Sequence, residues 1–289
     1  MNTEHLAPLD LPQSFMDVVK REFVPYTVPL ARMRDGKANE FTALGSGVLV
    51  QRGSRFGILT ARHCLHACGA VHARAGEVLL GPSGRDTLCL SLRGGRGILV
   101  QPQEVKEHPL VTPQSDEFGP DLAFIEVLPG DRLTSFKANG SFWSLDQNPG
   151  DLAKDFARTG WWLASIGFPQ VYYDTLIDGN SIRHAVQHQT YITAIQDGDI
   201  FERDGWDYIE VNMDYNCSGA LPDSFKGVSG GPVWCMQLRK HKVDGHLTIE
   251  KSALVGIIFY ETGKRNNQQR LRAHFIRSIY DLAWRGIGV

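Results

Sequence analysis

Hydrophobic residues along most of this chain come in short runs that are bounded by glycine, proline and polar residues. Runs of this length, several of them alternating with polar positions, are typical of β-strands. We therefore predict strands over the ranges 26–33, 41–51, 55–61, 77–80, 87–92, 98–105, 122–128, 161–168, 181–195 (one or two strands), 208–213, 231–238 and 253–260. The last two are expected to form a hairpin with a polar tip over 239–251. A strand-rich chain with frequent turns predicts an all-β fold.

Helical spacing is confined to the two ends of the chain. Near the N-terminus it is set by Phe15, Val18, Val19 and Phe23, and near the C-terminus by Phe275, Ile276, Ile279 and Leu282. We predict helices over 12–23 and 271–284, and a short helical turn over 63–70. Residues 129–158 are polar and are interrupted by two Pro-Gly pairs, so they are predicted to be a connection and loops.

One stretch carries candidate chemistry, because Ser229 stands among glycines in Gly227-Val228-Ser229-Gly230-Gly231-Pro232. Glycine adopts backbone conformations that other residues hold only at a cost, and such a turn can point successive N–H groups into one concavity. A concavity of this kind stabilises a developing negative charge. Ser229 is therefore a candidate nucleophile beside an oxyanion hole. A glycine-rich turn between two strands is the alternative.

A serine nucleophile needs a base and a group that orients the base. His63 ends an apolar run in Thr60-Ala61-Arg62-His63-Cys64, and Asp121 precedes a predicted strand in Gly119-Pro120-Asp121-Leu122-Ala123. With these residues the sequence resembles the chymotrypsin/trypsin family of serine proteases. The motifs T-A-x-H-C, D-[IL]-A-[LFV] and G-x-S-G-G-P occur here in the family's order, between residues 60 and 232.

The resemblance implies a fold of two six-stranded antiparallel β-barrels over residues 26–286, with the site in the cleft between them. The first barrel is expected over about 26–130, the second over about 155–270 and a C-terminal helix over about 271–286, with residues 1–25 as a helical N-terminal extension. His63 is then the base, Asp121 fixes its tautomer, and the N–H groups of Gly227 and Ser229 hold the oxyanion. The implied activity is that of a serine endopeptidase without a cofactor.

Substrate recognition is expected from residues near the serine and on the strand over 253–260. Asp223 and Ser224 stand where the family has the floor of its specificity pocket, and such an aspartate pairs with Arg or Lys of the substrate. The alternative is that Asp223 caps a surface turn. The family's Ser-Trp-Gly is replaced by Phe259-Tyr260-Glu261, so the serine that supports the aspartate is missing. Glu261 is expected to narrow the pocket or to add negative charge to it.

Two other kinds of site are weighed and set aside. The serine motif also fits the nucleophile elbow of α/β-hydrolases, but that fold needs its acid and histidine after the serine, and only 60 residues follow Ser229. A zinc site is suggested by five residues, His63, Cys64, His66, Cys68 and His72. Their spacing matches no common zinc finger, so no metal is expected.

Charge and cysteine content restrict partners and location. The net charge of −2 gives no support for a nucleic-acid partner, and no apolar run is long enough for a membrane span. The N-terminus lacks the features of a signal peptide. The five cysteines are an odd set, and Ala43-Leu44-Gly45 occupy the region where the family's partner of Cys64 is expected. Free thiols in a bacterial cytoplasm are therefore expected.

Three expectations remain open about activity and control. The chain is expected to cut a protein or peptide substrate, but it could also be a trypsin-like binding module with an impaired site, or a protease effector in a multi-protein bacterial defence system. A regulatory protein partner is also expected. In the family's zymogens an aspartate before the serine pairs with a newly cut N-terminus. Val228 stands there instead, so activation by that route is not expected.

Overall fold

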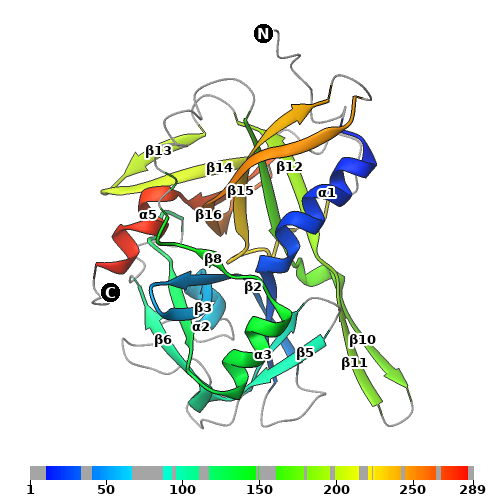
Figure 1. Cartoon of the computed structure of the whole chain (residues 1–289), viewed down its shortest axis with the longest axis vertical. Helices are drawn as coiled ribbons and strands as arrows, with labels where there is room; N and C mark the ends of the chain where they lie inside the picture. Colours follow the sequence, from blue (N-terminus) through cyan, green and yellow to red (C-terminus); the bar gives the residue numbers. More distant parts are fainter. Residues whose placement is uncertain are drawn as a thin grey trace.

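The computed structural model describes residues 11–33, 41–66, 87–92, 96–110, 117–147, 149, 161–178, 181–195, 199–214, 221–222, 224–241, 245–264 and 268–285. These ranges form two large sheets, one below the other in Figure 1, with helices at their margins. The predicted strand over 77–80 lies outside the described residues.

The first sheet is built from the N-terminal half of the chain. Its strands follow the order β5-β4-β1-β2-β3-β7-β6, and β8 pairs with β2 in parallel. Their bounds are β1 (Thr27–Met33), β2 (Phe41–Arg52), β3 (Arg55–Thr60), β4 (Thr87–Leu92), β5 (Arg96–Val100), β6 (Val105–Pro109), β7 (Ala123–Val127) and β8 (Trp143–Ser144). Val28, Leu30, Leu49 and Ile58 are among the buried residues that fill its core.

The second sheet is built from the C-terminal half and follows the order β12-β9-β15-β16-β17-β14-β13. The strands of this half are β9 (Trp161–Gly167), β10 (Tyr173–Asp178), β11 (Ser181–Val186), β12 (Gln189–Ala194), β13 (Ile200–Arg203), β14 (Trp206–Asp214), β15 (Pro232–Lys240), β16 (Leu247–Glu261) and β17 (Gln268–His274). Strands β10 and β11 form a separate hairpin that projects from the body in Figure 1.

The two antiparallel halves confirm the predicted all-β class and the double-barrel architecture. The predicted count of six strands in each half is too low, because among the described residues the first sheet has eight strands and the second has seven. Strands β10 and β13 were not predicted. The hairpin of β15 and β16 has a shorter tip than predicted, because both strands continue into the polar stretch.

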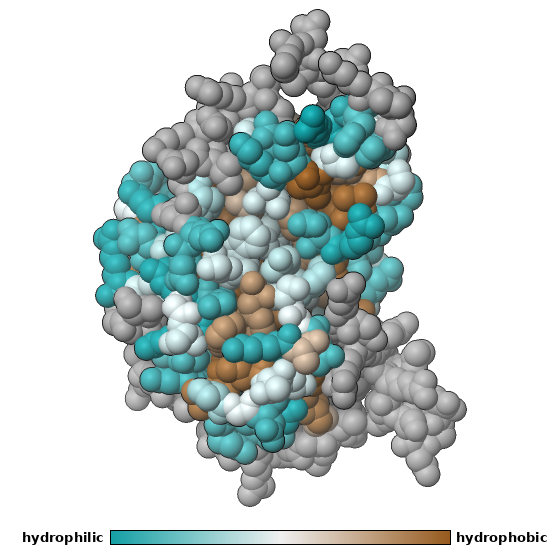
Figure 2. All heavy atoms as spheres, viewed as in Figure 1, coloured by the Kyte–Doolittle hydropathy of each residue, from teal (hydrophilic) through white to brown (hydrophobic). Residues whose placement is uncertain are grey.

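The N-terminal helix α1 (Gln13–Phe23) is confirmed, and the short turn η2 (Val24–Tyr26) connects it to β1. In Figure 1 α1 lies along the outside of the second sheet, although it precedes the first sheet in sequence. Its face of Phe15, Val19 and Phe23 is buried, and the Phe23 ring stacks on Trp234 with centroids 4.8 Å apart. The space-filling view in Figure 2 shows two hydrophobic areas on this face, one beside this helix and another in the lower half of the view.

The prediction of irregular structure over 129–158 is wrong in its first part, which forms α3 (Asp131–Asn139) and β8. Phe136 is buried and Leu133 is partly buried, and both pack on the core of the first sheet. The single strand predicted over 98–105 is also wrong. It is divided by η4 (Pro102–Glu104), because proline has no N–H to donate to a strand ladder.

The predicted start of the C-terminal helix at Leu271 is wrong, and the second sheet extends beyond residue 270. Residues 268–274 form β17, which pairs with both β14 and β16. The helix α5 (Ile276–Tyr280) and the turn η6 (Leu282–Trp284) follow it. Short helices also occur as α2 (His63–His66) and η5 (Gln170–Tyr172). None of the helices in the described ranges is long and apolar enough to span a bilayer.

Candidate active site

His63 and Asp121 meet because β3 and β7 are neighbours. His63 opens α2 just after β3, and Asp121 stands just before β7, which pairs with β3 in antiparallel fashion. The N–H of His63 donates to Oδ1 of Asp121 at 2.9 Å, and ring atom Nδ1 is hydrogen-bonded to Oδ2. The His63 side chain is 45% exposed and that of Asp121 only 8%, so the imidazole can be reached from solvent while its partner is covered.

The two groups shift each other's pKa values. Partial burial lowers the pKa of His63, but the adjacent Cys64 sulfur and the hydrogen bond and charge of Asp121 raise it well above its ordinary value. Burial raises the pKa of Asp121, and the bonds and charge of His63 outweigh burial and hold it below its usual range. The pair is therefore arranged to stabilise a protonated imidazole above an ionised carboxylate.

The Ser229 loop from the second half of the chain lies against the first sheet beside His63. The Ser229 carbonyl accepts the N–H of Ser46 on β2 at 2.7 Å and the thiol of Cys64 at 3.2 Å. Gly227 and Gly230 have φ of +95° and +83°, which only glycine adopts readily. At Gly230 a Cβ atom would also meet the carbonyl oxygen of Ser46 at 2.0 Å. Gly230 is thus needed for this close approach, and both glycines are needed for the backbone conformation of the loop.

Two peptide groups before Ser229 are fixed by residues that the sequence analysis did not identify. The Lys226 carbonyl accepts the N–H of Gln170 at 2.7 Å. The Gly227 carbonyl accepts the hydroxyl of Ser46 at 2.7 Å, and that hydroxyl in turn accepts the N–H of Phe168 at 3.0 Å. Ser46 is completely buried. A polar residue between two glycines in an apolar strand was the available signal.

The predicted substrate-binding residues are partly described. Asp223 lies outside the described residues. Glu261 ends β16 and reaches the chain before the serine, where it accepts the N–H of Phe225 at 3.1 Å and the hydroxyl of Ser224 at 3.4 Å. Its carboxylate also accepts the side-chain amide of Gln269 at 2.5 Å. Glu261 therefore joins the end of β16 to the segment that leads to the serine.

The neighbouring β16 residues contact two β17 side chains that bind the segment carrying Asp121. Tyr260 is half-buried, with the Arg272 guanidinium 5.4 Å from its ring centroid. Phe259, which takes the place of the family's supporting serine, is buried and stacks on His274 with centroids 4.4 Å apart. His274 was not identified from the sequence, where it is one of several polar residues over 268–274. Its ring accepts the backbone N–H of Asp121 at 2.9 Å.

The suggested zinc cluster is only partly described, since Cys68 and His72 lie outside the described ranges. Across the parts of the chain that the structure describes, no group of three or more His, Cys, Asp or Glu residues could hold a metal ion. Cys64, Cys89 and Cys235 carry free thiols. Burial raises the pKa of the Cys89 thiol to about 11.

Two β-barrels with a histidine–carboxylate pair and a glycine-rich serine loop at their junction define the chymotrypsin-like class of fold. The family model described as Trypsin matches residues 16–284, so the chain belongs to the trypsin family. No curated protein matches the chain.

Proposed function

We propose that the protein is a serine endopeptidase that hydrolyses peptide bonds through His63, Asp121 and Ser229 and a covalent acyl-enzyme. The observation that carries this proposal is the His63–Asp121 hydrogen bond beside the anchored carbonyl of Ser229. Membership of the trypsin family supports a peptidase of this class.

In the proposed reaction, the Ser229 hydroxyl attacks the scissile carbonyl carbon while Nε2 of His63 takes the hydroxyl proton. The carbonyl oxygen becomes an oxyanion. When the carbon–nitrogen bond breaks, the same proton passes to the leaving amine and the acyl group stays on Ser229. A water molecule then attacks the ester, again with His63 as base, and releases the acid and the free hydroxyl. Asp121 stabilises the imidazolium of both steps.

The N–H groups of Gly227 and Ser229 are proposed to stabilise the oxyanion. In a trans peptide the carbonyl and the following N–H point in opposite directions. Because the Lys226 carbonyl is bonded to Gln170, the Gly227 N–H of the same peptide group points away from Gln170. The Ser229 N–H belongs to the peptide group of the Val228 carbonyl, which accepts the N–H of Gly231 at 2.8 Å. The bond from Ser46 fixes the peptide group between these two. The loop therefore needs little rearrangement to bind the oxyanion.

Labelling with a fluorophosphonate probe tests this proposal. Wild-type protein should gain the mass of one probe adduct at Ser229, and Ser229→Ala should gain none. Circular dichroism of both proteins controls for folding. If folded wild-type protein stays unlabelled, the peptidase proposal is rejected in favour of a trypsin-like binding module.

We further propose that cleavage occurs after Arg or Lys in a protein or peptide substrate. Glu261 places a carboxylate beside Ser224 and Phe225, and Asp223 precedes them in sequence. A carboxylate at a binding pocket favours a cationic side chain over a neutral one. A peptide library should show this preference, and both Glu261→Gln and Asp223→Ser should weaken it. Cleavage after small or aromatic residues would contradict it.

A reducing compartment such as the cytoplasm is proposed as the site of action. Cys64 follows the proposed base and is a free, fully buried thiol whose hydrogen bond to Ser229 belongs to the site. Thiol titration of the unfolded protein without reductant should recover all five cysteines. Fewer free thiols in protein prepared from a reducing cytoplasm would contradict this proposal.

A further inference from the structure

Asp121 is bonded to the second sheet through its own backbone. Its N–H donates to Nε2 of His274, the last residue of β17, at 2.9 Å. Because Nε2 accepts this bond it carries no proton, so the neutral ring holds its proton on Nδ1. Burial lowers the pKa of His274 to about 3, although the charge of Asp121 raises it. His274 is therefore a neutral acceptor near neutral pH.

The ring of His274 is held in the orientation that this bond needs. It stacks on Phe259, with centroids 4.4 Å apart, and lies 5.4 Å from Tyr208 and 5.9 Å from Trp206. Gly119 packs directly against it, because a Cβ atom there would be 3.2 Å from ring atoms Cε1 and Nε2. Aromatic neighbours on several sides and a backbone at close range leave the ring little freedom to rotate.

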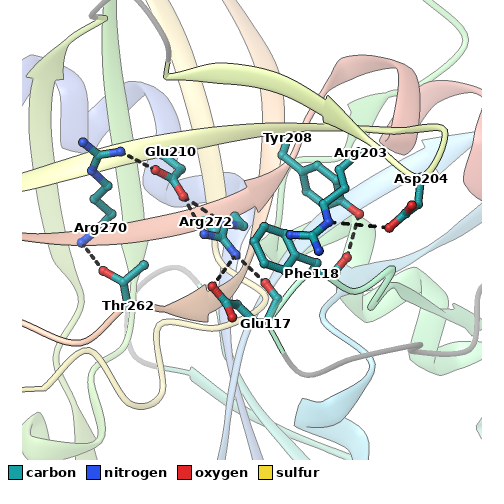
Figure 3. Close-up of polar contacts among 9 residues, drawn as sticks. All are labelled: Glu117, Phe118, Arg203, Asp204, Tyr208, Glu210, Thr262, Arg270 and Arg272. Carbon is teal, nitrogen blue, oxygen red and sulfur yellow. Dashed lines mark hydrogen bonds and ion pairs between the residues drawn. The ribbon is translucent and has the colours of Figure 1, made fainter.

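Arg272 holds the same segment from the same face of β17, since residues two apart on a strand point the same way. Its guanidinium donates to the carbonyl of Glu117 at 2.6 Å and lies 4.1 Å from the ring centroid of Phe118. Figure 3 shows this guanidinium between Glu117 and the carboxylate of Glu210, to which it donates at 2.9 and 2.7 Å. Arg272 is thus oriented by Glu210 and bound to the backbone before Asp121.

Tyr208 on β14 adds a third attachment. Its hydroxyl donates to the carbonyl of Phe118 at 2.7 Å, as Figure 3 shows, and it is paired with His274 in the β14–β17 register. The backbone over 117–121 is therefore bonded at three of its five residues by side chains from the second sheet. Within the described ranges, both hydrogen bonds to the Asp121 carboxylate come from His63.

We propose that His274 is a positioning residue for Asp121, and that with Tyr208 and Arg272 it makes the second barrel hold the catalytic carboxylate supplied by the first. This inference rests on the proposed peptidase function. Phe259 offers no hydroxyl to the Asp121 carboxylate, so apart from its bonds to His63 the place of that carboxylate depends on its backbone. Small displacements of a catalytic group cause large losses of rate.

Three substitutions at position 274 test whether the hydrogen-bond acceptor of this side chain is needed or only its packing. In His274→Gln the amide oxygen can reach the place of Nε2 and accept the bond. His274→Asn is polar but too short, and His274→Leu fills space without an acceptor. We expect kcat to fall about 10- to 100-fold in the Asn and Leu variants, with KM nearly unchanged, and to stay near the wild-type value in the Gln variant. Wild-type kcat in the Asn or Leu variant, or equal loss in all three, would overturn the proposal.

A second readout does not require turnover. Because the charge of Asp121 raises the pKa of His63, displacement of the carboxylate should lower that pKa, by about half a unit or more. Titration of isotope-labelled His63 by NMR should show this in the Leu and Asn variants but not in the Gln variant. The control is His241→Leu, which removes a histidine at the tip of the β15–β16 hairpin. It should leave the His63 pKa unchanged.

The two readouts distinguish failure of the inference from failure of the proposed function. If wild-type protein does not react with the fluorophosphonate probe but the His63 pKa falls in His274→Asn, positioning stands and the peptidase proposal fails. If wild-type protein reacts and the Asn variant keeps both its kcat and its His63 pKa, the positioning proposal fails alone. Should the Leu variant not fold, the comparison of Gln with Asn still decides.

Discussion

The pKa of His63 determines where the proposed activity begins on the pH scale. Only the neutral ring can take the serine proton, and its pKa is raised well above the ordinary 6.5. The neutral form, and with it kcat/KM, should therefore disappear on acidification with a midpoint above 6.5 rather than at it. A pH–rate profile measures this midpoint. Activity that stays flat down to about pH 5 would contradict a histidine base.

Removing either partner of the His63–Asp121 pair should reduce turnover without unfolding the protein. In Asp121→Asn the ring loses the anion that stabilises its charged form and fixes its tautomer, so kcat should fall about 10⁴-fold. The kcat of His63→Ala should fall by a comparable factor. Steady-state kinetics measures both, and circular dichroism checks the fold. A loss of less than about tenfold in either variant would contradict the assigned roles.

Ser46 should matter for rate because it fixes the Gly227 carbonyl. In Ser46→Ala this carbonyl and the Phe168 N–H lose their buried partner, so we expect about 1–3 kcal/mol less stability and about a tenfold or greater loss of kcat.

The matched control for Ser46 is Ser165→Ala, because Ser165 is equally buried and its hydroxyl has no hydrogen-bond partner in the described structure. Kinetics and urea unfolding of both variants make the comparison. Equal losses of kcat in the two variants would show that the Ser46 bond has no part in the proposed oxyanion site.

At the scale of elements, α1 is an integral part of the fold. Phe23 is 1% exposed and stacks on Trp234, so Phe23→Ala should lower the free energy of unfolding by about 3–5 kcal/mol. Glu22→Ala, at an exposed position of the same helix, should change it by about 0.5 kcal/mol or less. Urea denaturation measures both, and similar values for the two variants would show that α1 is only loosely attached.

The elements also show where the periodicity of apolar residues is sufficient to predict the secondary structure and where it is ambiguous. The hairpin of β2 and β3 was predicted within a residue or two, because two apolar runs flank a Gly-Ser turn. Strand β17 was misassigned to a helix, because Leu271 and Ala273 at strand spacing continue directly into Ile276 and Ile279 at helical spacing. Only the pairing of residues 268–274 with β14 and β16 shows where the strand ends and the helix begins.

At the scale of the whole molecule, formation of a competent active site should not require proteolytic cleavage near the N-terminus. Val228 is completely buried, and its side chain packs against Gly167, where a Cβ atom would lie 2.7 Å from Cγ1. An ammonium group brought there would be buried without a counter-charge. The intact 289-residue chain should therefore react with the fluorophosphonate probe. Mass spectrometry of the labelled protein checks that it is uncut, and labelling only after loss of N-terminal residues would refute this.

The sequence by itself determined the parts of this protein that depend on neighbouring residues. The strand runs, the helix α1 and the surroundings of His63, Asp121 and Ser229 are local patterns, and the last three sufficed to indicate the trypsin family. Gly227 and Gly230 could be expected in the serine loop because their positive φ is a local requirement.

The tertiary structure alone decided which distant side chains hold that site in place. His274 is 153 residues from Asp121, and Ser46 is 181 residues from Gly227, so no periodicity links either pair. Ser46 is one polar residue in an apolar strand, and His274 is one of several polar residues in β17, so the role of each depends on what the fold places opposite it. A buried polar group needs a partner, but the sequence does not say which one, because that partner is chosen by the packing of the two barrels.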